Sequence, residues 1–178
     1  MKEFTASIHC FPGRTCEPVN SIDFQAEIDA ASLSFEFLVR GDIDAVRWPT
    51  VGKAERRDNL WKTTCLEVFL TLPAPGSYAE FNFSPSGDWA AYAFSDYREG
   101  MTPLQCGSPN IAVQRASSET RISIQLNAFD STVLTSGGKL AASAVIEDRS
   151  GALHYWALAH PGPKPDFHHP DSFILGPI

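Results

Sequence analysis

Apolar and polar residues alternate with period two along several short stretches of the chain. In residues 32–40 every second position is apolar, and these side chains share one face: Leu33, Phe35, Phe37 and Val39. The same alternation occurs in residues 64–70, 78–84 and 121–126. Because period two places successive side chains on opposite faces of an extended backbone, these stretches are predicted to be half-buried strands.

Glycine and proline clusters interrupt the chain at short and fairly even intervals, for example at Pro12-Gly13 and Pro85-Ser86-Gly87. Residues 139–147 and 152–158 are predicted to form a hairpin that turns through residues 148–151. Turns at this spacing leave no room for the long helical crossovers that a parallel sheet needs.

Helical periodicity is weak throughout, and a short helix fits best at residues 21–31. About nine or ten short strands in a chain of this length indicate an all-β fold, an antiparallel β-sandwich of the jelly-roll type. No composition shift marks a linker, so residues 1–178 are predicted to form one domain, with the proline-rich residues 161–165 as a loop inside it.

The composition limits the classes of molecule that the protein is expected to bind. Hydrophobic residues make up 43% of the 178 residues, which is enough to bury a core. The formal charge is −7 and the basic residues are scattered, so nucleic acids and anionic membranes are disfavoured as partners. We find no signal peptide and no apolar stretch long enough to span a membrane, and expect a cytoplasmic protein with its four cysteines reduced.

The sharpest geometric inference concerns Glu67, Glu80 and Asn82. A hairpin centred on the turn at residues 73–76 pairs residues whose numbers sum to about 147 to 149. Glu67 then faces Glu80 directly, or faces Asn82 with Glu80 one pair away, and all three side chains emerge on one surface. Two like charges placed as cross-strand neighbours are unfavourable unless something compensates them.

Four kinds of group are candidates for that compensation. An arginine could bridge the carboxylates, and three are candidates: Arg47, Arg98 and Arg121. A hydroxyl-rich ligand could donate hydrogen bonds to them, and a hard cation such as calcium could bind several of their oxygens. The pair could instead act in catalysis, as paired carboxylates do in glycosidases.

Tryptophans and histidines extend the list of candidate ligand-binding residues. Flat indole rings bind the apolar faces of sugars, which makes Trp61, Trp89 and Trp156 candidates, although each is also explained by core or turn packing. The C-terminal stretch from His160 to Asp171 gathers three histidines, but its spacing matches no metal motif. Histidines in such a loop are expected to hydrogen-bond the backbone or to line a ligand site.

Three stretches, residues 58–70, 78–92 and 155–161, carry a family resemblance. Here the sequence resembles bacterial DOMON-like proteins related to family nine carbohydrate-binding modules. The resemblance implies a β-sandwich in which Trp61 stacks on a sugar and Glu67 hydrogen-bonds its hydroxyls, with Trp156 as the second stacking tryptophan. In haem-binding DOMON domains the axial ligands are Met and His, for which Met101 with His154 or His160 would be the candidates.

Together these features predict a non-catalytic module that binds a carbohydrate or sugar derivative. No catalytic residue, metal ligand or cofactor is assigned, with calcium and haem kept as alternatives and the protein partner left open. A glycoside hydrolase using Glu67 and Glu80, or a haem or metal carrier, is the alternative function. The predicted ligand-binding residues are Trp61, Glu67, Glu80, Asn82, Trp89, Arg98, Trp156 and His160.

Overall fold

The computed structural model describes residues 1–29, 32–127 and 137–177. These residues form eleven strands: β1 (Lys2–Cys10), β2 (Val19–Ile28), β3 (Ser32–Gly41), β4 (Cys65–Thr71), β5 (Tyr78–Phe83), β6 (Trp89–Phe94), β7 (Thr102–Pro103), β8 (Asn110–Arg115), β9 (Glu119–Asn127), β10 (Leu140–Glu147) and β11 (Leu153–Ala157). Three single-turn 3₁₀ helices are also described: η1 (Ile43–Ala45), η2 (Leu60–Lys62) and η4 (Pro170–Ser172). Within these residues, no helix is long and apolar enough to cross a membrane.

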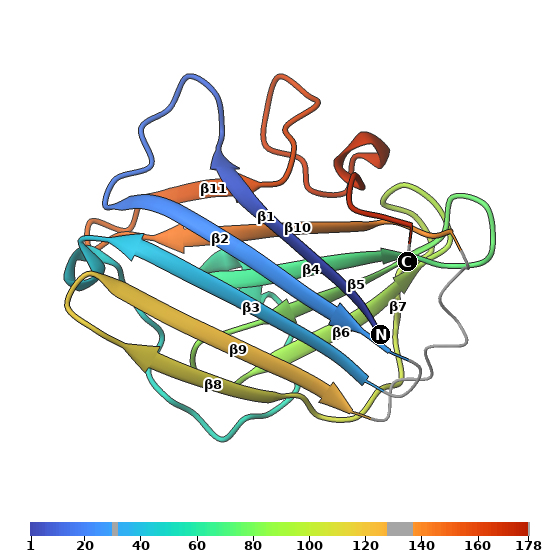
Figure 1. Ribbon diagram of the computed structural model, residues 1–178, viewed down its shortest axis with the longest axis horizontal. Helices are drawn as coiled ribbons and strands as arrows, with labels where there is room; N and C mark the ends of the chain where they lie inside the picture. Colours follow the sequence, from blue (N-terminus) through green and yellow to red (C-terminus); the bar gives the residue numbers. More distant parts are fainter. Residues whose placement is uncertain (30–31, 128–136, 178) are drawn as a thin grey trace.

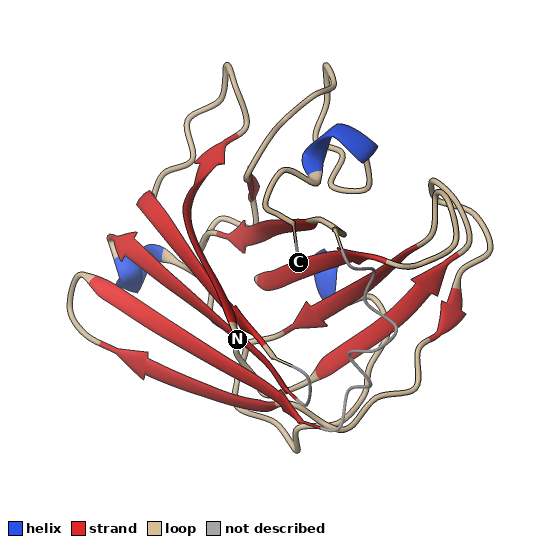
Figure 2. Ribbon diagram, turned by 45° about the vertical axis from the view of Figure 1, so that its right-hand side comes forward, coloured by secondary structure: helices blue, strands red, loops and turns tan. Residues whose placement is uncertain are grey.

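The strands form one curled antiparallel sheet that folds into two layers, in the order β7-β6-β5-β4-β10-β11-β1-β2-β3-β9-β8 (Figures 1 and 2). Strand β1 joins the layers, because residues 2–8 pair with β2 whereas His9 and Cys10 pair with β11. The predicted all-β fold, an antiparallel β-sandwich, is confirmed.

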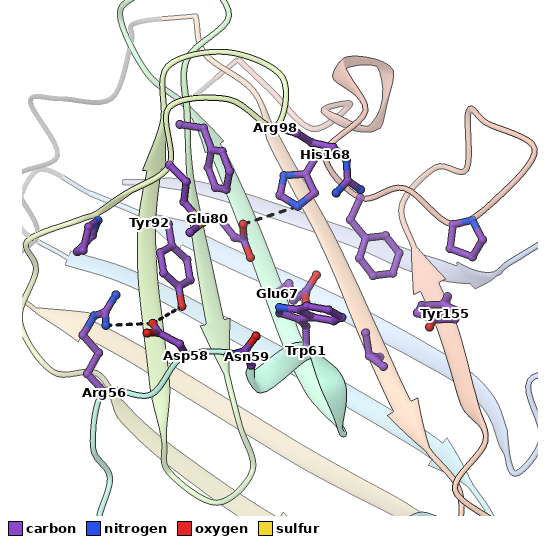
Figure 3. A pocket seen from close by; sticks show the side chains of 16 residues that line it. Arg56, Asp58, Asn59, Trp61, Glu67, Glu80, Tyr92, Arg98, Tyr155 and His168 are labelled. Atoms are coloured by element: carbon purple, nitrogen blue, oxygen red, sulfur yellow. Dashed lines mark hydrogen bonds and ion pairs between the residues drawn. The ribbon is translucent and has the colours of Figure 1, made fainter.

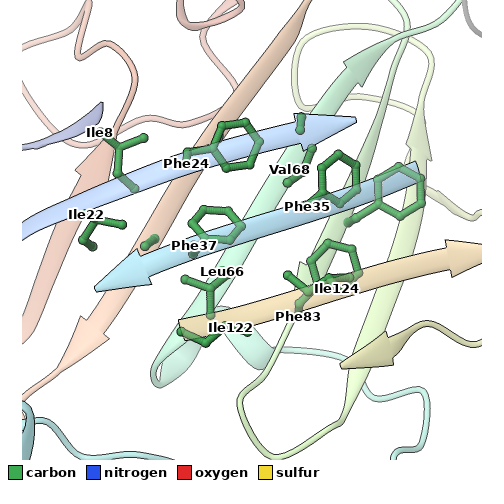
Figure 4. Close-up of a cluster of buried hydrophobic side chains, with 14 of the residues drawn as sticks. Ile8, Ile22, Phe24, Phe35, Phe37, Leu66, Val68, Phe83, Ile122 and Ile124 are labelled. Atoms are coloured by element: carbon green, nitrogen blue, oxygen red, sulfur yellow. The ribbon is translucent and has the colours of Figure 1, made fainter. Parts of the chain in front are cut away.

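The main core lies between the two layers. Strand β3 buries every second residue toward it, as the alternation in residues 32–40 predicts. Each fully buried side chain of this kind contributes roughly 1.5–3 kcal/mol through removal of apolar surface from water. The labelled core residues in Figure 4 are Ile8, Ile22, Phe24, Phe35, Phe37, Leu66, Val68, Phe83, Ile122 and Ile124.

Strands β4, β5 and β10 are buried on both faces. Their second face carries a smaller apolar cluster that includes Phe69, Tyr78 and Phe94, and Phe173 from the C-terminal segment packs against it. The ring of Phe173 lies 6.1 Å from that of Phe69, so the segment after β11 is held against this face of the sheet. The second face is therefore covered over part of its area and is not a fully solvated sheet surface.

Two predicted hairpins are confirmed. Strands β10 and β11 pair around the turn at residues 148–151. In the β4–β5 hairpin Glu67 lies opposite Asn82, and Glu80 follows two pairs further along, on the same face and opposite Phe69. Of the two predicted registers, the structure has the one whose numbers sum to 149.

The helix predicted at residues 21–31 is wrong over its described part, which belongs to β2 and the residue after it. Residues Ile22, Phe24, Ala26 and Ile28 alternate and are all buried, and β2 pairs with both β1 and β3. Polar residues separate them, so this segment has the same period-two alternation as the other strands, and ladder pairing on both sides favours the strand.

The prediction of four reduced cysteines is wrong for one pair. Cys10, at the end of β1, forms a disulfide with Cys16, and their Cα atoms are 5.9 Å apart. Cys65 and Cys106 are free thiols. The loop after β1 turns back on itself, which brings the first two cysteines together although their spacing suggests no motif.

Candidate functional site

A pocket of about 630 Å³ lies on the second face of β11, β10, β4, β5 and β6, the face turned away from the main core (Figure 3). Because successive side chains of a strand point to opposite faces, only every second residue of these strands reaches the pocket. They alternate with the core residues of the same strands and are Glu67 on β4, Glu80 on β5, Tyr92 and Phe94 on β6, Val145 on β10 and Tyr155 on β11.

Three connecting segments supply the other walls. Residues 56–61 contribute Trp61, residues 98–103 contribute Arg98, and residues 165–168 contribute His168. The turn η2 lies against β4 and β5, which brings Trp61 to the side of the pocket that Glu67 lines. Residues distant in sequence thus converge on one hollow.

Glu67 is the deepest carboxyl of the site, with 3% of its surface exposed. Its Oε2 accepts a hydrogen bond of 3.1 Å from the Ser143 hydroxyl on β10. Burial, and then the nearby Glu80 carboxyl, raise the pKa of Glu67 to about 8, against the opposing effects of Ser143 and Arg98. Near neutral pH this group is therefore ready to hold a proton.

Glu80 is 6% exposed and is fixed by Asn82, whose Nδ2 donates a 2.6 Å hydrogen bond to Glu80 Oε1. Its Oε2 lies 3.8 Å from Nε2 of His168. Burial raises the pKa of Glu80, and the Asn82 hydrogen bond and the charge of Arg98 oppose that shift. Asn82 acts as a support for Glu80, since Asn82 itself does not line the pocket.

A short chain of hydrogen bonds orients His168. The backbone N–H of Arg98 donates to the Tyr78 hydroxyl (3.2 Å), and that hydroxyl lies 2.8 Å from His168 Nδ1. Burial, and then Arg98, lower the pKa of His168 to about 4, and burial raises the pKa of Tyr78 to about 12. We assign Tyr78 as the donor to Nδ1, because its oxygen already accepts from the Arg98 N–H; the neutral imidazole then carries its proton on Nε2, which faces Glu80.

The arginines proposed to bridge the carboxylates bind other acidic groups. Arg98 forms an ion pair of 2.7 Å with Asp166, which also accepts a hydrogen bond from the hydroxyl of Tyr97. Arg47 pairs with Glu147, and Arg121 pairs with Glu36. Arg98 lines the pocket and acts on the carboxyls through space without hydrogen-bonding them.

The opposite end of the pocket is built by Arg56, Asp58 and Tyr92. The Tyr92 hydroxyl donates a 2.6 Å hydrogen bond to Asp58, and Arg56 lies 3.2 Å from the same oxygen (Figure 3). The hydrogen bond from Tyr92 lowers the pKa of Asp58, so this carboxyl is ionised at neutral pH. Arg56 also stacks over the Tyr92 ring at 5.3 Å.

Trp61 is the exposed aromatic residue of the pocket, with 49% of its surface accessible. It sits on η2, where Asn59 adopts a left-handed backbone conformation that begins the turn. Lys62 lies 5.5 Å from the indole and contacts it as a cation over the ring. A half-exposed indole beside buried carboxyls is available for stacking on a ligand.

The structure places four predicted site residues outside this pocket: Asn82, which hydrogen-bonds Glu80, and three others. Trp89 and Trp156 are 6% and 5% exposed and belong to the main core, because their positions on β6 and β11 have the core parity. His160 is engaged with the backbone, since its Nε2 lies 2.8 Å from the carbonyl oxygen of His9. The pocket face of β11 carries Tyr155 instead.

The donors considered for haem do not converge. Met101 lines the pocket, whereas His154 lies against Asp148 and the carbonyl of Thr15, and His160 binds His9. Across the described residues, no group of three or more His, Cys, Asp or Glu side chains could hold a metal ion. These residues do not fit an axially ligated haem.

Sequence reasoning missed several pocket residues: Arg56, Asp58, Tyr92, Phe94, Tyr155, Phe167 and His168. Extending the period-two alternation through β6 would have found Tyr92 and Phe94. On β11 the adjacent Tyr155 and Trp156 are both aromatic, and the other missed residues come from connections, which carry no such periodic signal.

Comparison with known proteins shows which solved structures share this fold. No protein-family profile and no curated protein sequence matches the chain. Among solved structures it is similar to a protein of Bacteroides uniformis described as a candidate carbohydrate-binding protein (TM-score 0.69, 11% identity, 96% of this chain and 84% of that one). It is also similar to a family nine carbohydrate-binding module of Caldicellulosiruptor kristjanssonii in complex with cellotriose (TM-score 0.50, 12% identity, 87% and 72%). At these identities the likeness establishes a shared β-sandwich fold.

Proposed function

We propose that the protein binds a carbohydrate or sugar derivative in the pocket and does not turn it over. The observation that carries the proposal is the exposed indole of Trp61 beside two buried carboxyls, Glu67 and Glu80. An indole face covers the C–H surface of a sugar ring, and carboxylate oxygens accept hydrogen bonds from its hydroxyls. A few fixed polar groups in an otherwise aromatic pocket are typical of small-molecule sites.

The structural neighbours support this class of ligand. One is described as a candidate carbohydrate-binding protein, and the family nine module is described in complex with cellotriose. We extend the proposal to kinship with DOMON-like relatives of such modules. Its support is the placement of Trp61 six residues before Glu67 and the lining of one pocket by both.

Binding is favoured over hydrolysis by the direction from which the carboxyls approach. A glycosidase needs its two carboxyl groups on either side of the scissile bond. Glu67 and Glu80 project from neighbouring strands of one sheet face, so both reach a ligand from the same wall. Asp58, the other carboxylate that lines the pocket, is held by Tyr92 and Arg56.

The test is a panel of neutral and charged oligosaccharides titrated into the wild-type protein, followed by tryptophan fluorescence and thermal shift. We expect saturable quenching and a raised melting temperature with at least one of them, and no release of reducing ends over hours. Absence of any response at millimolar sugar would overturn the proposal, and release of reducing ends would favour the hydrolase.

A further inference from the structure

The two buried carboxyls each have one oxygen bound by the protein and one left for the pocket. Ser143 occupies Oε2 of Glu67, and Asn82 occupies Oε1 of Glu80. Among the described residues nothing hydrogen-bonds the other two oxygens, because His168 Nε2 stays 3.8 Å from Glu80 Oε2. Two acceptors on neighbouring strands therefore face the same hollow without a partner.

The two arginines that line the pocket are already paired elsewhere. Arg98 is bound by Asp166 at 2.7 Å, and Arg56 is bound by Asp58 at 3.2 Å. His168 is neutral at physiological pH, because burial and Arg98 lower its pKa. The described part of the chain thus supplies no cation in contact with the carboxyl pair, which explains the acidic character of this wall.

Aromatic side chains form much of the remaining lining: Trp61, Tyr92, Phe94, Tyr155 and Phe167. Aromatic faces attract cations as well as the C–H faces of sugars. An apolar lining also strengthens the attraction between a carboxylate and an ammonium group, because it lowers the local dielectric constant. The pocket therefore suits a ligand that is both ring-shaped and cationic.

We infer that the ligand is an amino sugar, whose protonated amine lies between Glu67 and Glu80 while a sugar ring stacks on Trp61. This inference rests on the proposed function and names the class of carbohydrate. A neutral sugar would satisfy the two free oxygens with hydroxyl donors, but it would supply no counter-ion, so the pair would still have to keep a proton to limit its charge. An ammonium group satisfies both requirements at once.

Release of a proton on binding would distinguish an amino sugar from a neutral sugar. The free pair retains a proton near neutral pH because burial and the Glu80 carboxyl raise the pKa of Glu67 to about 8, and an arriving ammonium lowers that pKa. The other ionisable groups facing the pair keep their state: Arg98 and Asp166 as an ion pair, and His168, Tyr78 and Cys65 as neutral groups. Arg56, Asp58 and Tyr92 remain coupled to one another at the far end.

Three trisaccharides that differ only at C2 of each ring test the inference: the glucosamine trimer, its N-acetylated form and cellotriose. Calorimetric titration of the full chain in phosphate and in HEPES, at a pH below the pKa of the sugar amine so that the ligand arrives as an ammonium ion, reports affinity and proton release together. We expect the glucosamine trimer to bind at least about tenfold more tightly than the other two. Only its binding enthalpy should depend on the buffer, with the sign of proton release.

Glu67→Gln and Glu80→Gln keep the shape of the site and remove its charge. Either change should reduce glucosamine binding to the level of cellotriose, whereas Glu3→Gln, an exposed position on β1, should leave it unaltered. Equal affinity for the three trisaccharides, or tighter binding of cellotriose, would overturn the inference and leave the proposed function standing. Failure of every sugar to bind would overturn both.

Discussion

Glu67 and Asn82 lie directly opposite each other in the β4–β5 hairpin, and this pairing organises the pocket. It places Glu80 two pairs further along, on the same face, where the Asn82 amide hydrogen-bonds it. Shifting the register by one residue would turn the carboxyls of one strand into the main core. The position of both acids is thus a property of the sheet.

Replacing Trp61 with alanine should weaken carbohydrate binding by at least ~1 kcal/mol, because the stacking face is lost. The free energy of unfolding should change by less than about 0.5 kcal/mol, since the indole is half exposed and lies outside both apolar clusters. Calorimetric titration and urea unfolding measure the two quantities. Trp48→Phe is the matched control, because Trp48 lies outside the pocket; an equal loss of affinity in both variants would contradict the assignment.

Stability should fall as the pH rises above 6.5. A carboxyl whose pKa is raised by folding stabilises the protein fully below its ordinary pKa of 4.5, and this contribution is lost as pH rises through the folded value, about 8 for Glu67. His168 acts in the opposite sense, because its pKa is lowered from 6.5 to about 4, but its effect is complete above pH 6.5. The range from pH 6.5 to about 8 therefore reports on the carboxyl pair.

Glu67→Gln should flatten this dependence by ~1 kcal/mol between those pH values, as measured by urea unfolding at several pH values. Glu3→Gln should keep the wild-type slope, since its carboxyl is exposed. An unchanged slope in Glu67→Gln would show that Glu67 titrates normally in the folded protein.

The sequence predicts the strands with one apolar face better than those buried on both. From Leu33 to Val39 every second residue is apolar and buried, and β3 lies where this pattern predicts a strand. On β11 both Tyr155 and Trp156 are large and aromatic, so alternation cannot decide which of them faces the main core. That choice depends on pairing with β1 and β10 and on the C-terminal segment covering the opposite face, which are long-range contacts.

The connections of the site were less predictable than its strands. Hairpin register follows from one short turn, so the positions of Glu67 and Glu80 could be deduced locally. His168 reaches Glu80 only because Phe173 anchors its segment on Phe69, a contact across about a hundred residues. No local pattern in the sequence encodes such a contact.

The disulfide predicts a simple alkylation pattern. After denaturation without reductant, two cysteines should react with iodoacetamide, Cys65 and Cys106, and all four should react after reduction. Loss of the cross-link through Cys10→Ser with Cys16→Ser should cost roughly 2 kcal/mol of stability, since the closed loop is short. Peptide mass mapping and urea unfolding check both points, and four reactive thiols in the unreduced protein would contradict the disulfide.

Tyr78→Phe should alter the pocket through His168. The ring stays packed against Phe94, 4.8 Å away, but the hydroxyl that donates to His168 Nδ1 is removed. Without that donor the Nε2–H tautomer of His168 loses the hydrogen bond that stabilises it. The ¹⁵N chemical shifts of His168 should therefore indicate a mixture of the two neutral tautomers instead of one. Ligand affinity should fall severalfold, while stability should fall by about 1 kcal/mol for the lost hydrogen bond.

Tyr97→Phe, which removes a hydroxyl bound to Asp166 instead, should leave the His168 tautomer unchanged. A single Nε2–H tautomer in Tyr78→Phe would show that Glu80, and not Tyr78, orients the ring.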